Sequence, residues 1–219
     1  MAAQEFRSYE NAFGTLRQFA RRPQNVERCE LCSAVLASQH PHLLEPIGRK
    51  LICACDACAL LFSGRARAKF KRVPRYVRFR ADFHLTDAQW DSLMIPINMA
   101  FFFRSSPEGR MVAMYPSPAG ATESLLSLET WTEIARDNPE LNAMEADVEA
   151  LLVNRIGHSR GFSAPEHYIL PIDECFKLVG LIRLHWKGFS GGTEVWQEIA
   201  RFFEELKGKV LVPSGGSRA

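Results

Sequence analysis

Residues 29–58 read CELCSAVLASQHPHLLEPIGRKLICACDAC, and this stretch decides the fold of the first part of the chain. It contains two Cys-x-x-Cys pairs, Cys29/Cys32 and Cys55/Cys58, with 22 residues between them. A Cys-x-x-Cys turn brings two thiolates together, and two such turns joined by a hairpin supply the four converging ligands of a tetrahedral metal. The spacing therefore predicts a zinc-ribbon-like four-cysteine module.

Three more side chains in this stretch are candidate ligands. Cys53 lies on the expected hairpin, whose strands are residues 42–45 and 50–53, and it either substitutes for one of the four cysteines or is a spare thiol. His40 and His42 form a His-x-His pair at the start of the hairpin and are less favoured alternative ligands. Because thiolate and imidazole both bind transition metals, five thiols with two imidazoles would also suit metal transfer.

Zn²⁺ is the expected metal, because redox-inert sites of four cysteines with this spacing usually hold it. A rubredoxin-like iron site uses the same geometry, so iron stays an alternative. Four thiolates leave no open coordination position, and the expected role is therefore structural: the metal folds a module too small to fold alone.

The charge of the chain is divided unevenly. Its 27 Lys+Arg and 25 Asp+Glu give a net charge of only +2, but residues 1–80 carry 15 basic and 6 acidic side chains, and residues 81–219 carry 12 and 19. With 47% hydrophobic and 24% charged residues the composition is that of a globular protein and excludes wholesale disorder. We expect a basic zinc-ribbon-like module at 1–80 that includes an N-terminal helix at 8–20, an α+β domain at 81–212 and a disordered tail at 213–219.

A strongly basic stretch follows the cysteines, with no acidic residue between Ala57 and Ala81. Aromatic residues are interleaved with its cationic side chains, which are Arg65, Arg67, Lys69, Lys71, Arg72, Arg75, Arg78 and Arg80. Such a surface suits a nucleic-acid backbone. It equally suits an acidic protein partner, the acidic half of the same chain, or plain solvation. The sequence leaves these interpretations open.

The second region has an α+β pattern for which a mainly antiparallel sheet is expected. Strands are predicted at 99–103, 110–115 and 168–170, and 148–153 is either a strand or a helix end. Capping boxes at Thr86/Gln89 and Thr130/Glu133 predict two helix starts, and Asp173 is the predicted N-cap of a third. Residues 190–193 open a last helix with an apolar face. Cys175 is expected to be a buried small side chain, since no His-plus-acid constellation accompanies it and no catalytic residue is recognisable.

Targeting patterns are missing from the sequence. The N-terminal residues MAAQEFRSYE have no apolar segment after their first basic residue, so a secretory signal is not expected, and no run approaches the ~18 apolar residues of a membrane span. Five of the six cysteines cluster within 30 residues, which fits metal binding better than a disulfide scaffold. We expect a cytoplasmic protein without membrane insertion.

Several segments together resemble an uncharacterised family of bacterial proteins, mainly actinobacterial, that is encoded beside nickel–iron hydrogenase genes. The resemblance is carried by CELC at 29–32, LICACDACALLF at 51–62, LTDAQWDSL at 85–93, AFFFRSS at 100–106, YPSPAGATESLL at 115–126, DVEALLVNR at 147–155, PIDECFKLVGLIRLHW at 171–186 and SGGTEVWQEIARFF at 190–203. It implies a non-enzymatic accessory role in assembly, maturation or electron supply of a hydrogenase, with a hydrogenase subunit or maturation factor as partner. No catalytic residue comes with it. A zinc-ribbon nucleic-acid-binding protein and a rubredoxin-like redox or metal-delivery protein are the alternatives.

Overall fold

The computed structural model describes residues 26–64, 68–124, 128–158, 161 and 163–210. The helix predicted at 8–20 and the tail at 213–219 lie outside the described residues. The first part of the chain contains β1 (His42–Glu45), β2 (Lys50–Cys53), α2 (Asp56–Ser63) and β3 (Lys71–Arg72). The larger body contains β4 (Arg78–Phe79), α3 (Asp87–Ser92), β5 (Met99–Ser105), β6 (Arg110–Ser117), β7 (Gly120–Ser124), α4 (Leu128–Asp137), the 3₁₀ helix η1 (Pro139–Ala143), β8 (Glu149–Asn154), β9 (Glu166–Pro171), α5 (Ile172–His185) and α6 (Gly192–Lys209).

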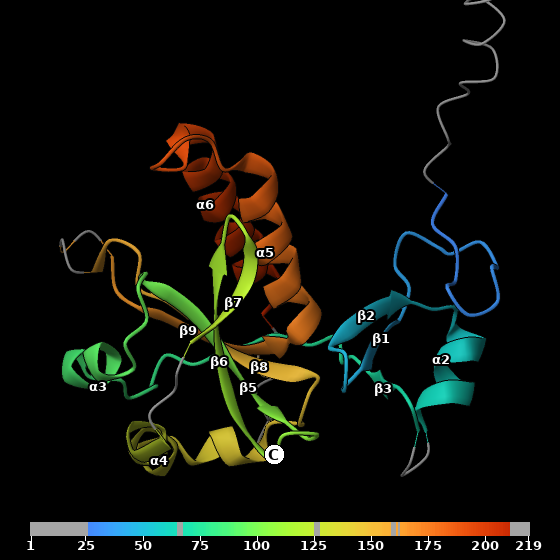
Figure 1. Ribbon diagram of the computed structural model, residues 1–219, viewed down its shortest axis with the longest axis horizontal. Helices are drawn as coiled ribbons and strands as arrows, with labels where there is room; N and C mark the ends of the chain where they lie inside the picture. The colour runs from blue at the N-terminus through green and yellow to red at the C-terminus, as the bar shows by residue number, and fades with distance from the viewer. Residues whose placement is uncertain (1–25, 65–67, 125–127, 159–160, 162, 211–219) are drawn as a thin grey trace, which may run out of the picture.

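The strands form two sheets. A three-stranded sheet has the order β2-β1-β3, and a six-stranded sheet has the order β4-β9-β8-β5-β6-β7. All strand pairs within these two sheets are antiparallel. The α+β class with an antiparallel sheet is therefore confirmed. In Figure 1 the small sheet and α2 lie at one side of the six-stranded sheet.

Both faces of the six-stranded sheet are buried, which explains the continuous apolar runs in its central strands. Along β5, Phe101 and Phe103 belong to one core and Phe102 belongs to the other, as the two-residue period of a strand requires. Helices α5 and α6 cover the first face, while α3, α4 and η1 cover the second (Figure 1). The sheet is thus sandwiched between two helical layers.

The N-cap of helix α6 is a glycine, and any other residue at this position would be strained. Gly191, its N-cap, has φ 87°, and a Cβ there would lie 2.8 Å from Cγ1 of Val195. From this start the helix buries a stripe that continues to Leu206, namely Val195, Ile199, Phe202, Phe203 and Leu206. The helix predicted to follow residues 190–193 is confirmed.

The small sheet packs against the body through its central strand. Leu43 in β1 belongs to a separate small core around the cysteines, whereas the adjacent Leu44 is buried in the core beneath α5 and α6. Val73 and Val77 join Leu44 there. The chain then passes from the small sheet to the six-stranded sheet, where β4 (Arg78–Phe79) pairs with β9. Because β4 is a strand of the six-stranded sheet, the body begins before residue 80.

The structure confirms some of the predicted elements and corrects others. The hairpin at 42–45 and 50–53 is confirmed, as is the reciprocal capping box of Thr86 and Gln89. The start predicted at Thr130 is wrong, because α4 already includes Leu128. Asp173 is not an N-cap either: α5 begins at Ile172 after Pro171, and Asp173 lies within its first turn. The ambiguous segment at 148–153 falls largely in strand β8.

A membrane-spanning helix is not found among the described residues, since none of their helices combines the necessary length with sufficient hydropathy.

Candidate metal centre

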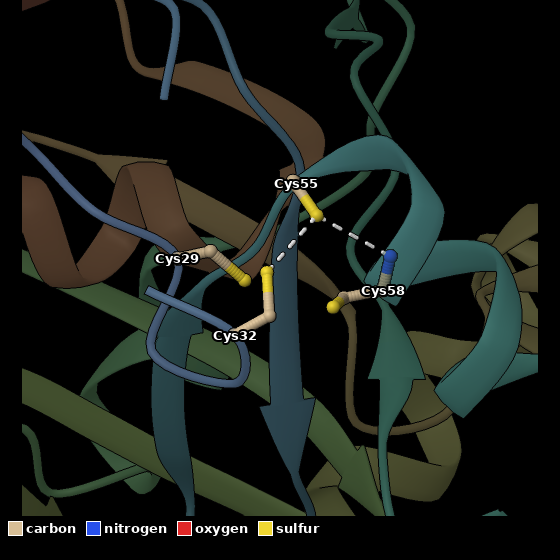
Figure 2. Close-up of side chains that lie close together, drawn as sticks. All are labelled: Cys29, Cys32, Cys55 and Cys58. Carbon is tan, nitrogen blue, oxygen red and sulfur yellow. Dashed lines mark hydrogen bonds between the residues drawn. The ribbon is translucent and has the colours of Figure 1, made fainter. Parts of the chain in front are cut away.

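The first cysteine pair lies in a tight turn that precedes β1. The amide of Cys29 donates to the carbonyl of Ala34 at 2.8 Å, and the amide of Ser33 donates to the carbonyl of Cys29 at 2.7 Å. Ser33 takes up the left-handed conformation, with φ 62°, directly after Cys32. These bonds bend the chain back on itself, so both thiols of the pair lie on the same side of the turn (Figure 2).

The second pair lies at the start of a helix, where the Cys-x-x-Cys spacing predicts only a turn. Cys55 is the N-cap of α2, and its Sγ accepts the amide of Cys58 at 3.5 Å. The amides of the first helical turn are not used within the helix, so they are free to donate to sulfur, as the amide of Cys58 does to Cys55. The second pair is therefore held in an environment that suits metal-binding sulfur.

The two pairs converge. The Sγ atoms of Cys29, Cys32, Cys55 and Cys58 all lie within 4.8 Å of one another, and those of Cys32 and Cys55 are 3.7 Å apart. Figure 2 shows the four sulfur atoms directed at a common point between the turn and the start of α2. All four are free thiols. The cluster predicted from the spacing is present, and it could hold a metal ion in a zinc-ribbon-like site.

The pKa values of Cys29 and Cys58 are shifted in opposite directions. Burial raises the pKa of Cys29, but the amides of Cys55, Leu31 and Cys32 outweigh burial and lower it to about 6. Burial, followed by the neighbouring thiols, raises the pKa of Cys58 to about 12. Cys29 thus ionises readily, whereas Cys58 resists ionisation because it is buried and surrounded by the other thiols. A cation between them is what would allow all four to be thiolates.

The other candidate ligands form a group of their own. One ligand atom each of His40, His42 and Cys53 lies within 4.8 Å of the other two. This group also contacts a residue that the sequence gave no reason to place at this cluster. Nδ1 of His42 lies 2.6 Å from Oδ2 of Asp173 in α5, and this hydrogen bond, acting against burial, raises the pKa of His42. Because His42 and Asp173 are 131 residues apart in the sequence, no local sequence pattern indicates that they pair.

Three side chains of the basic stretch bind carboxylates of the body. Nζ of Lys71 lies 2.7 Å from Asp147, whose side chain is 3% exposed. Nη2 of Arg78 lies 2.7 Å from Glu149, which is 1% exposed. Arg80 contacts the carboxylates of Glu140 at 3.1 Å and Asp82 at 3.5 Å. Of the partners considered for the basic stretch, these pairs favour the acidic half of the same chain.

The rest of the basic stretch is placed differently. Arg72 lies 3.8 Å from Asp56 within the small module, and Lys69 lies over the ring of Phe70. Arg75 is exposed. Arg65 and Arg67 lie outside the described residues. A further bridge comes from Arg49 in the hairpin turn, which pairs with Glu108 and Glu123 of the body.

Cys175 does not belong to either cluster. It is completely buried in α5, where it packs in the core between the sheet and the helices. Burial, together with the charges of Asp173 and Glu174, raises its pKa well above the ordinary value. A protonated thiol inside an apolar core is a packing group, as the sequence suggested.

Comparisons with known proteins give one match. No curated protein and no solved structure is significantly similar to the chain. A family model matches residues 28–210, which span both cysteine pairs, both sheets and all the described helices. The chain therefore belongs to DUF5947, a family of unknown function.

Proposed function

We propose that the chain is a zinc-binding accessory protein that acts through protein–protein contacts. The observation that carries the proposal is the convergence of four thiols within 4.8 Å on two rigid elements, the turn at Cys29–Cys32 and the start of α2. A site with four thiolates has no position for a substrate, so its metal would stabilise the module rather than carry out chemistry.

The size of the module supports a structural metal. Its core consists of six buried residues, and two of these, Cys29 and Cys58, are ligands of the proposed site. The other four are Leu43, Ile52, Ala54 and Ala59. So small an apolar cluster contributes little free energy of folding, and a bound metal would supply most of it. Zn²⁺ fits this role best because it is redox-inert and accepts tetrahedral thiolate coordination.

An apolar surface on α2 supports the protein-partner part of the proposal. Leu60, Leu61 and Phe62 follow the second cysteine pair and are 68%, 63% and 42% exposed. Contiguous exposed apolar side chains of this size are characteristic of interaction sites. The metal centre would hold α2, and with it this surface, in a fixed orientation. The family resemblance makes a subunit or maturation factor of a nickel–iron hydrogenase the proposed partner.

Metal analysis of the purified chain tests the first part. A colourless protein that contains zinc supports the proposal, and its four cysteines should be needed to retain the metal. A red protein with thiolate-to-iron charge-transfer bands would replace structural zinc by a rubredoxin-like iron centre.

Affinity capture from the native host tests the second part. The tagged chain should retain a hydrogenase subunit or maturation factor, and a variant in which Leu60 and Leu61 are changed to Glu should retain less of it. Recovery of nucleic acid in place of such a protein, removed by moderate salt, would favour the nucleic-acid alternative.

A further inference from the structure

The second cluster, His40, His42 and Cys53, has the composition of a metal site in its own right. Imidazole and thiolate are the side chains that bind borderline divalent ions such as Zn²⁺ and Co²⁺. The His-x-His segment leads into β1, and Cys53 ends β2, where it is the register partner of His42. The strand pairing places Cys53 opposite His42, and His40 precedes β1 by two residues, so that one ligand atom of each lies within 4.8 Å of the other two.

His40 is held in the tautomer that a metal requires. Its Nδ1 lies 2.9 Å from the carbonyl of Ala37, and a carbonyl only accepts, so Nδ1 carries the hydrogen. Nε2 is left with a free lone pair. The side chain is only 7% exposed, and Nε2 is a buried atom without a hydrogen-bond partner among the described residues. A buried imidazole nitrogen is rarely left unpaired in a folded protein, and a bound cation would satisfy it.

His42 is held in the same tautomer by a carboxylate. Nδ1 of His42 donates to Oδ2 of Asp173 at 2.6 Å, which again leaves Nε2 to bind. A carboxylate behind the ring fixes its orientation and makes the opposite nitrogen a better ligand, as it does in many zinc sites. Asp173 is thus a positioning residue for His42, supplied from α5 of the body.

The backbone of Cys53 is fixed as well. Its amide donates to Oε1 of Glu30 at 2.9 Å, and its carbonyl accepts the amide of Glu30 at 2.9 Å. Glu30 lies between the first two cysteines of the four-cysteine cluster. The third donor of the second cluster is therefore anchored on the turn that forms the first, and both clusters share one rigid scaffold.

The geometry points to a second metal site, in which His40, His42 and Cys53 bind a divalent transition-metal ion. Three protein ligands leave one tetrahedral position open, in contrast to the four-thiolate cluster. A metal there exchanges ligands and accepts an external donor atom, such as a thiolate, imidazole or carboxylate of a partner. The site lies where the small module meets α5, because Asp173 of α5 holds one of its three ligands.

The total metal content of the full chain tests this inference. Wild-type protein is kept reduced, incubated with excess Co²⁺, passed through gel filtration and analysed for the sum of zinc and cobalt. We expect two metal ions in the wild type and one in Cys53→Ser and in His42→Gln. His185→Gln is the matched control, because His185 also pairs with a carboxylate, Glu194 at 2.9 Å, but lies far along α5. It should retain two.

The role of Asp173 has its own readout. Asp173→Asn keeps an acceptor oxygen for His42 but removes the charge, so the thiolate-to-cobalt band of Cys53 should persist while Co²⁺ affinity falls about 10- to 100-fold. Unchanged affinity would remove Asp173 from the site.

The difference in metal content between wild type and Cys53→Ser decides the inference, and the ion left in Cys53→Ser reports separately on the four-cysteine site. Equal metal content in the two proteins overturns the second site even if the first holds zinc. A difference of one ion supports it even if the first site is empty.

Discussion

Nη2 of Arg78 lies 2.7 Å from Oε1 of Glu149, and this ion pair is where the basic stretch enters the six-stranded sheet. The carboxylate is almost completely buried, and its other oxygen accepts the amide of Glu145 at 2.6 Å. A buried carboxylate is stable only with such partners. At this pair, a positive charge of the basic stretch is matched by a negative charge of the body inside the molecule.

Removal of Arg78 should destabilise the protein strongly. In Arg78→Ala the charge of Glu149 stays buried without its counterion, and we expect the free energy of unfolding to fall by about 3 kcal/mol. Urea denaturation measures this. Arg75→Ala, which removes an exposed arginine from the same stretch, should change it by less than about 0.5 kcal/mol. Equal effects of the two substitutions would contradict a special role for the Arg78–Glu149 pair.

The cysteines should separate into two classes on substitution. Changing Cys29, Cys32, Cys55 or Cys58 to Ser removes one of four converging thiolates and should abolish stable metal retention at that site. Cys53→Ser should leave it intact. The charge-transfer absorption of the cobalt-substituted four-cysteine site gives the measurement, because its intensity follows the number of bound thiolates. Loss of this site in Cys53→Ser would assign Cys53 to it.

Chelation of the metal proposed for the four-cysteine cluster should unfold the small module first. Its core of six buried residues is much smaller than the two cores that flank the six-stranded sheet. After a strong chelator, the amides of Leu43 and Ile52 should exchange hydrogen rapidly, whereas those of Leu151 and Tyr168 stay protected. Simultaneous loss of protection at all four would indicate that the two parts unfold as one unit.

Acid should destabilise the body through His167. Burial, with a smaller contribution from the charge of Arg155, lowers its pKa from 6.5 to about 4. Between pH 6.5 and 4 the unfolded chain binds a proton at His167 that the folded chain does not bind. The contribution of His167 to the free energy of unfolding is therefore fully present above pH 6.5 and is lost as the pH falls toward 4. The shift corresponds to a loss on the order of 3 kcal/mol.

Substitution of His167 isolates this contribution. The ring stacks on Phe83 with centroids 4.6 Å apart, and an apolar side chain retains this packing. His167→Leu should therefore show a smaller loss of stability between pH 6.5 and 4 than the wild type in urea denaturation. Parallel pH profiles for the two proteins would exclude His167 as the source.

The exposed apolar surface of α2 should contribute to binding and not to stability. Changing Leu60 and Leu61 to Glu alters side chains that are mostly in solvent, so the unfolding free energy should change by less than about 0.5 kcal/mol per site while partner capture falls. Leu184→Glu, at a residue of α5 that is 77% exposed, serves as the control. Equal loss of capture in the control would argue against a specific surface.

Much of the metal centre could be predicted because its determinants are local. A Cys-x-x-Cys spacing brings two thiols together through the turn alone, and a four-residue turn fixes the register in which His42 faces Cys53. The capping box at Thr86 likewise depends on atoms three residues apart. Short-range patterns of this kind are visible in sequence.

The failures involve tertiary contacts or weak local patterns. Helix α2 was not predicted, because it starts at a cysteine and has apolar residues exposed on its surface. Asp173 was misassigned because a proline took the capping position, and its actual partner, His42, is distant in sequence. The ion pairs of Lys71 and Arg78 depend on how two sheets pack, which charge counts do not encode.

Strand β4 sets a limit on how the protein can be divided. Its two residues pair with β9 and occupy the outer edge of the six-stranded sheet, although they follow the small module directly. A fragment that starts at residue 81 would leave β9, with the buried residues Tyr168, Ile169 and Leu170, as an open edge. Unpaired apolar edges recruit other chains into intermolecular sheets. Expression of the α+β part for binding assays should therefore begin before Val77, or aggregation will be mistaken for a requirement for metal.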